Sequence, residues 1–121
     1  MRYWRPFTEE AVADAARDGI KRLLALTLYP HYSKATTGSS ESRLKEILKN
    51  YSIECSYISS FYDHPFYIEA LVDTIRKGLD KFNNAPVVLF SAHSLPVKFI
   101  EEGDPYVKHI TGTIKAITDK I

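Results

Sequence analysis

The sequence is poor in residues that form covalent cross-links or metal clusters. It contains one cysteine, Cys55, among 121 residues. A single cysteine excludes an intramolecular disulfide and a CxxC metal site, and alone it cannot build an iron–sulfur cluster. We therefore predict no iron–sulfur cluster in this chain. Cys55 is expected to be a small core residue on a strand.

An excess of charge of either sign is also missing. Lys and Arg number 16 and Asp and Glu number 15, which gives a net charge of +1. This balance argues against nucleic-acid binding. The longest strongly apolar run, residues 23–29, is far shorter than the roughly 20 residues of a transmembrane helix, and no signal-peptide pattern opens the chain. We expect a soluble cytoplasmic protein without a transmembrane segment, with peripheral membrane association left open.

The sequence does contain a regular alternation of helix and strand patterns, built from 45% hydrophobic residues. Helices are indicated by apolar residues at three- and four-residue spacing, and strands by short apolar runs that end at Pro or Gly. Asp104 and Pro105 have the positions of a helix cap and a first helical residue. The patterns predict helices at residues 8–19, 44–51, 65–82 and 104–121, and strands at residues 20–29, 53–57 and 87–91.

Alternating helices and strands predict a three-layer, partial Rossmann-like α/β fold, in which a parallel sheet has helices on both faces. We expect residues 1–121 to form a single α/β unit. Three predicted strands leave two sheet edges and much helix surface uncovered. The pattern is therefore typical of a piece of a larger doubly wound protein.

Three of the four histidines fall in segments that follow predicted strands. Ligands of open α/β sheets bind beyond the carboxyl ends of the strands, which here are followed by His31, His64 and His93. His93 could act as a proton acceptor or a metal ligand, or its ring nitrogens could simply satisfy nearby backbone groups. His64 is most simply a helix-start residue, and His109, on the last predicted helix, is expected to be solvated.

Two polar segments could contact an anionic or flat ligand. Residues 36–40, TTGSS, precede a predicted helix and could present hydroxyl and N–H groups to an anion. They lack the ending of a phosphate loop, and a loop in which Ser39 or Ser40 caps the helix is the simpler interpretation. Residues 2–5, RYWR, combine two cations with two aromatic rings, which suits a flat anionic ligand, although a fraying terminus is the alternative.

Several motifs, taken together and in order, resemble ferrochelatase, the metal-inserting enzyme of haem synthesis. They are MRYWRPFTEEAV, LYPHYS followed by TTGSS, FYDHPFYIEAL, and above all SAHSLP followed by EEGDPY. The resemblance implies a fold of two Rossmann-like halves around a porphyrin cleft. It covers only the middle third of the family pattern, from the end of the first half to the start of the second.

The resemblance implies roles for four residues. His93 matches an active-site histidine described as a proton acceptor, a metal ligand or both, and Arg2, Tyr3 and Ser40 match positions that contact the porphyrin. The implied reaction inserts ferrous iron into protoporphyrin IX or a coproporphyrin, and both are substrates, so no permanently bound cofactor is expected. His31 stands where relatives often carry Gln and receives no catalytic role.

The alternative is a fragment without catalytic activity. The carboxyl-terminal part of the family pattern, which supplies an acidic residue opposite the histidine, has no counterpart in this sequence. A fragment of this kind could bind porphyrin or metal without turnover, or could be inert and self-associate. It could also require pairing with the missing half.

Overall fold

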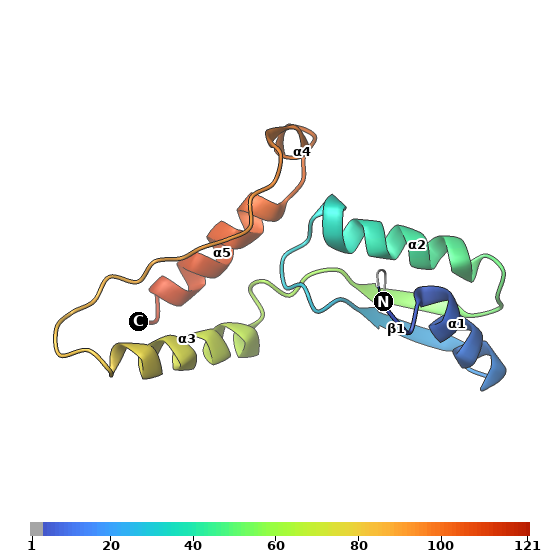
Figure 1. Cartoon of the computed structure of the whole chain (residues 1–121), viewed down its shortest axis with the longest axis horizontal. Coiled ribbons are helices and arrows are strands. Elements are labelled where there is room, and N and C mark those ends of the chain that lie inside the picture. The colour runs from blue at the N-terminus through green and yellow to red at the C-terminus, as the bar shows by residue number, and fades with distance from the viewer. Residues whose placement is uncertain (1–3) are drawn as a thin grey trace. The chain divides into compact units, whose positions relative to one another are not determined.

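A computed structural model describes residues 4–121, which divide into two compact units (Figure 1). The units are Met1–Ser60 and Phe61–Ile121. The sequence predicted one α/β unit instead. Each unit has its own cluster of buried hydrophobic residues.

The first unit is an α/β unit around a two-stranded parallel sheet. Strand β1 (Arg22–Leu26) pairs with β2 (Glu54–Ile58) in a register that runs from Arg22↔Glu54 to Leu26↔Ile58. The connection contains η1 (Lys34–Gly38), a π-helix, and α2 (Ser39–Leu48), and α1 (Thr8–Arg17) precedes the sheet. The predicted α/β class and the parallel pairing of the first two strands are therefore confirmed.

The ends of α1 follow from its sequence. The backbone N–H of Phe7 donates a 2.8 Å hydrogen bond to Glu10, and Glu9 and Glu10 place negative charge at the positive end of the helix. Gly19, with φ of +75°, adopts the left-handed conformation that ends the segment. The predicted helix is thus present, and Phe7 occupies its capping position.

One face of the sheet is covered by the helices and the other is open. Val12 of α1 packs with Ile47 and Leu48 of α2 against the inward-facing Leu23 and Cys55. The expected core position of Cys55 on a strand is confirmed. On the opposite face, Leu24 and Leu26 are 63% and 54% exposed. Residues 4–60 therefore place helices on one face, where the sequence predicted helices on both.

The second unit is helical in the residues that the structure describes. Its helices are α3 (Pro65–Leu79), α4 (Val97–Glu101) and α5 (Tyr106–Thr118). Ile68 and Val72 of α3 pack against Ile117 of α5, and Phe90 packs onto this cluster. The predicted last helix is present, but it begins at Tyr106 and Pro105 rather than Asp104 occupies the capping position. The buried Asp104 carboxylate accepts a 3.0 Å hydrogen bond from the Tyr106 N–H.

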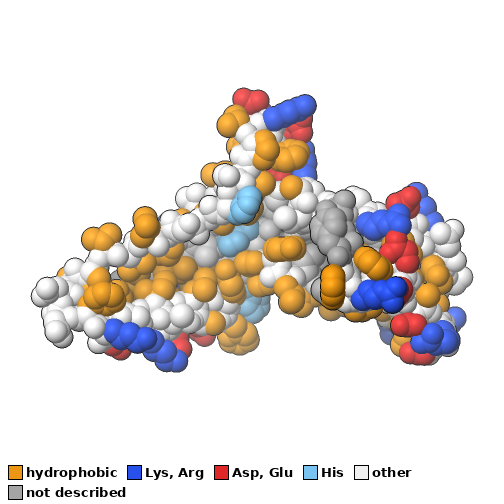
Figure 2. All heavy atoms as spheres, viewed as in Figure 1, with side chains coloured by type: hydrophobic (Ala, Val, Ile, Leu, Met, Phe, Trp, Pro, Cys, Tyr) orange, Lys and Arg blue, Asp and Glu red, His pale blue; other side chains and the backbone are white. Residues whose placement is uncertain are grey.

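The predicted strand at residues 87–91 is wrong. These residues belong to neither a helix nor a strand. Val87 and Leu89 are 94% and 89% exposed, whereas Val88 and Phe90 are half-buried, so the alternation of a strand is present without its pairing. A strand needs a neighbour for its backbone hydrogen bonds, and residues 61–121 form no other strand. Figure 2 shows hydrophobic side chains at the surface of the molecule.

A glycine on α5 allows an aromatic ring to pack against the helix backbone. A Cβ at Gly112 would lie 2.7 Å from Cε2 of Tyr62. The Tyr62 ring stacks on His109 at a centroid distance of 4.0 Å, and the Thr113 hydroxyl donates a 2.7 Å hydrogen bond to the Tyr62 carbonyl. These contacts connect α5 to the residues that lie just before α3.

We predict opposite effects for alanine at the two helical glycines of this unit. Gly112→Ala should lower the free energy of unfolding by about 1–2 kcal/mol, because the Tyr62 ring must move off His109. Gly78→Ala is the matched control, since no atom lies within 4 Å of its added Cβ. It should stabilise by about 0.5–1 kcal/mol. Urea unfolding followed by circular dichroism measures both, and a shift of the same sign in both variants would contradict the packing described.

Candidate functional site

A cavity of about 490 Å³ lies beyond the carboxyl end of β1. A volume of this size is typical of small-molecule sites. The position is the one that the sequence predicted for a ligand, because open α/β sheets bind ligands beyond their strand ends. Its described lining is mostly apolar, aromatic or hydroxyl-bearing, and comprises Trp4, Thr8, Ala25, Leu26, Thr27, Leu28, Tyr29, Ala35, Thr36, Ser40, Glu41 and Leu44.

Residues Lys34–Gly38, in the connection between β1 and α2, form a π-helix where the sequence predicted a loop. The Ser33 hydroxyl accepts a hydrogen bond from the Ala35 N–H, and the Ser33 carbonyl accepts one of 3.0 Å from the Gly38 N–H. Neither Ser39 nor Ser40 caps the following helix, so that prediction is wrong, and Gly38 takes the capping position. A Cβ at Gly38 would lie 2.6 Å from the Tyr32 hydroxyl oxygen, which explains the glycine. Short π-helices frequently occur at functional sites.

The π-helix and the start of α2 bring hydroxyl groups to the cavity. Thr36 and Ser40 line it. The neighbouring Thr37 is fully buried, and its hydroxyl oxygen has no hydrogen-bond partner. Ser40, the predicted porphyrin contact, therefore lies on the wall of the cavity.

Glu41 is a cavity residue that the sequence analysis missed. Its Oε1 accepts a hydrogen bond from the Ser59 hydroxyl, and its Oε2 lies 3.7 Å from the Lys45 ammonium nitrogen. Lys45 in turn lies 4.7 Å from the centre of the Tyr57 ring. Burial, the neighbouring Cys55 and the negative charge of Glu41 raise the pKa of Tyr57 to about 12. The only sequence signal for Glu41 is its place directly after TTGSS.

The predicted porphyrin contacts Arg2 and Tyr3 lie outside the described residues. The adjacent Trp4 lines the cavity, although its side chain is 75% exposed overall. Arg5 lies 3.9 Å from the carboxylate of Glu10. The first described residues of the chain thus reach the same cavity as Ser40.

His93 lies in the second unit, in the irregular segment 91–96, and its side chain is exposed. Its Nδ1 lies 2.8 Å from the carbonyl oxygen of Ser94. A carbonyl oxygen only accepts hydrogen bonds, so this contact assigns the ring proton to Nδ1 and leaves the Nε2 lone pair available in the neutral imidazole. Such a nitrogen can accept a proton or coordinate a metal. The structure therefore places His93 and Ser40 in different units.

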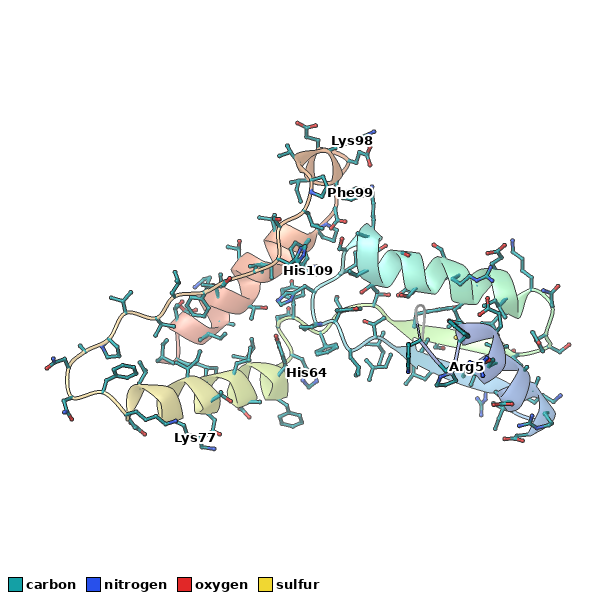
Figure 3. All side chains as sticks on the ribbon, in the orientation of Figure 1. Arg5, His64, Lys77, Lys98, Phe99 and His109 are labelled. Atoms are coloured by element: carbon teal, nitrogen blue, oxygen red, sulfur yellow. The ribbon has the colours of Figure 1, made fainter. Side chains whose placement is uncertain are left out.

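The other histidines take structural positions. His64 stands at the capping position of α3, as predicted (Figure 3). Its ring lies 5.5 Å from that of Phe66. His109 is half-buried against Tyr62 rather than solvated. Burial and, to a smaller extent, the positive charge of Lys108 lower the pKa of His109. The negative charges of Asp63 and Asp104 act in the opposite direction, but the pKa is lowered overall. His31 is half-buried in the segment after β1.

Within residues 4–121, no three His, Cys, Asp or Glu side chains group together as a metal site would require. None of the described helices is long and apolar enough to cross a membrane.

A parallel strand pair, helices packed on one of its faces and a cavity beyond a strand end together define an α/β protein with a candidate ligand site. Comparison with protein families matches residues 1–121 to ferrochelatase. The chain belongs to the ferrochelatase family.

Curated relatives support this assignment over the whole chain. Ferrochelatase of Geobacter metallireducens is 52% identical over 124 residues, which cover 99% of this chain and 39% of the relative. The Geotalea uraniireducens ferrochelatase is 51% identical over 125 residues, which cover 100% of this chain and 39% of the relative. The Aquifex aeolicus ferrochelatase is 44% identical over 122 residues, which cover 98% of this chain and 39% of the relative. The chain thus spans about two-fifths of the length of these relatives.

We predict that protonation of His109 destabilises the second unit. Its pKa is lowered from 6.5 in the folded chain, so the unfolded chain binds this proton more readily. The stability contributed by the neutral ring is present above pH 6.5 and is lost as the pH falls through the folded pKa. His109→Phe retains an aromatic ring against Tyr62 but does not titrate. Urea unfolding at about pH 7.5 and about pH 5.5 should show a smaller acid-induced loss in the variant, and an equal loss would contradict the prediction.

Proposed function

We propose that this chain takes part in the insertion of ferrous iron into protoporphyrin IX or coproporphyrin III. The cavity beyond β1 carries this proposal, because Ser40 and Trp4 line it together with apolar side chains that suit a flat macrocycle. Arg2 and Tyr3, which directly precede Trp4, add a cation and an aromatic ring for the same ligand. The reaction would take place in the cytoplasm.

In this proposal His93 is the proton acceptor or metal ligand. Insertion of iron(II) into a porphyrin releases the two pyrrole N–H protons, and a neutral imidazole with an available Nε2 lone pair can accept one of them. The 2.8 Å contact between Nδ1 of His93 and the Ser94 carbonyl supports this role, because it fixes the required tautomer. Iron and porphyrin enter as substrates, and Cys55 alone offers no basis for an iron–sulfur cluster.

A second candidate is a fragment that binds porphyrin or self-associates without turnover. The exposed leucines of β1, Leu24 and Leu26, and the exposed Val87 and Leu89 favour it. Such apolar surface is typically covered by a partner, either a second copy or further ferrochelatase polypeptide. The two candidates differ in turnover, and the inert, self-associating form of the second also differs in porphyrin binding.

We predict that porphyrin binding can be followed through Trp4, the only tryptophan of the chain. Protoporphyrin should quench the emission of Trp4, because the indole ring of Trp4 lines the cavity. Ser40→Phe, which fills the cavity wall, should weaken binding at least about tenfold. Ser42→Phe is the matched control, because Ser42 is exposed on the same helix and does not line the cavity. Equal affinities of the two variants would show that porphyrin binds elsewhere.

We predict that His93→Ala lowers the rate of zinc or iron(II) insertion by about 100-fold or more, the usual contribution of a general base. The rate is measured by absorbance with protoporphyrin as the acceptor. Porphyrin binding should be retained, and His64→Ala, an exposed histidine of the same unit, should insert metal at the wild-type rate. If the folded wild-type chain binds porphyrin without any turnover, the second candidate is supported instead.

A further inference from the structure

One charged side chain stands out on the wall of the cavity beyond β1. Of the described residues that line it, Glu41 alone has a charged side chain, and the others are apolar, aromatic or hydroxyl-bearing. The described wall therefore offers no cation to an acidic group of a ligand. A carboxylate that entered this cavity would instead meet a second carboxylate.

The Glu41 carboxylate is fixed in its position. Its side chain is only 12% exposed, the Ser59 hydroxyl donates to Oε1, and Lys45 lies on the side of Oε2. The Lys45 nitrogen is 3.7 Å from Oε2 and 4.7 Å from the centre of the Tyr57 ring, and Lys45 does not line the cavity. Glu41 is therefore held at the wall, while its positive partner lies outside the lining.

A fixed negative charge in a largely apolar cavity discriminates between ligands. Repulsion between like charges is much stronger near a protein's apolar surface than in bulk water, and an unpaired buried carboxylate is unfavourable even without a neighbour. Hydrocarbon groups of a ligand incur neither cost. The part of the wall around Glu41 thus favours an apolar edge of a ligand over an acidic one.

We propose that Glu41 is a specificity-determining residue whose carboxylate excludes the acidic substituents of a porphyrin from this cavity. The macrocycle then enters with a hydrocarbon-substituted edge first and its carboxylates directed away. This inference rests on the proposed porphyrin binding and adds the orientation of the ring and the class of porphyrin preferred.

The two candidate porphyrins differ in the number and the position of their carboxylates. Protoporphyrin IX carries its two propionates on neighbouring pyrrole rings, so the opposite edge bears only methyl and vinyl groups. Coproporphyrin III carries a propionate on every ring, so each edge brings a carboxylate toward the cavity. The wild-type chain should therefore bind protoporphyrin IX more tightly than coproporphyrin III.

The test is the ratio of the two dissociation constants, measured by quenching of Trp4 emission at low ionic strength. Glu41→Gln keeps an oxygen that can accept from Ser59 but removes the charge. It should tighten coproporphyrin III binding about tenfold, the effect of one removed charge repulsion, and leave protoporphyrin IX binding within about twofold. The effect should shrink in high salt, which screens charge interactions at the mouth of the cavity.

Two further variants separate the proposal from a general charge or folding effect. Glu46→Gln removes a carboxylate from the same helix, where Glu46 pairs with Arg43 and lies outside the cavity lining, and should leave the ratio unchanged. Lys45→Met leaves Glu41 charged without its partner. This variant should weaken the binding of coproporphyrin III further relative to that of protoporphyrin IX.

The outcomes distinguish this inference from the proposed function. If the wild-type chain quenches with neither porphyrin, porphyrin binding itself fails. If protoporphyrin IX binds but Glu41→Gln does not change the ratio, or Glu46→Gln changes it equally, the role of Glu41 is overturned. Opposite shifts in Glu41→Gln and Lys45→Met, with Glu46→Gln unchanged, support it.

Discussion

The parallel pairing of β1 with β2 is the contact on which the rest of the first unit depends. The register from Arg22↔Glu54 to Leu26↔Ile58 ends both strands at the same level, where the cavity begins. A parallel pair requires a crossover connection, and here η1 and α2 form it. The packing of α2 against Val12 of α1 then closes one face of the sheet. The position of Ser40 and Glu41 at the cavity wall is a consequence of this crossover.

Much of this fold could be predicted from local sequence patterns, because helices and short strands depend on periodicity and capping. Gly19 and Pro65 stand where the predicted boundaries required them. The strand predicted at residues 87–91 failed for a physical reason. Alternating apolar residues favour an extended backbone, but strand pairing also needs a neighbour, and local sequence carries no information on whether one is present.

The candidate site was predictable in part. The position of a cavity at a strand end follows from the order of helices and strands, and Ser40 was assigned by resemblance to the ferrochelatase motif. Glu41 could not be identified in this way, because its place on the cavity wall and its contact with Ser59, 18 positions away in the sequence, arise only from packing. The stacking of His109 on Tyr62 was missed for the same reason, since 47 residues separate the two. For His93 the sequence suggested the residue, while the assignment of its proton required the contact with Ser94.

The division of the chain into Met1–Ser60 and Phe61–Ile121 has a consequence for biosynthesis. The strand pair and the packing of α1 on α2 join residues between Thr8 and Ile58, so these contacts can all form once that part of the chain has left the ribosome. The contacts of α3 with α5 involve only later residues. Domains generally fold as units in the order of their synthesis. Translation would therefore allow the hydrophobic core beside the cavity to form before the segment that contains His93 has left the ribosome.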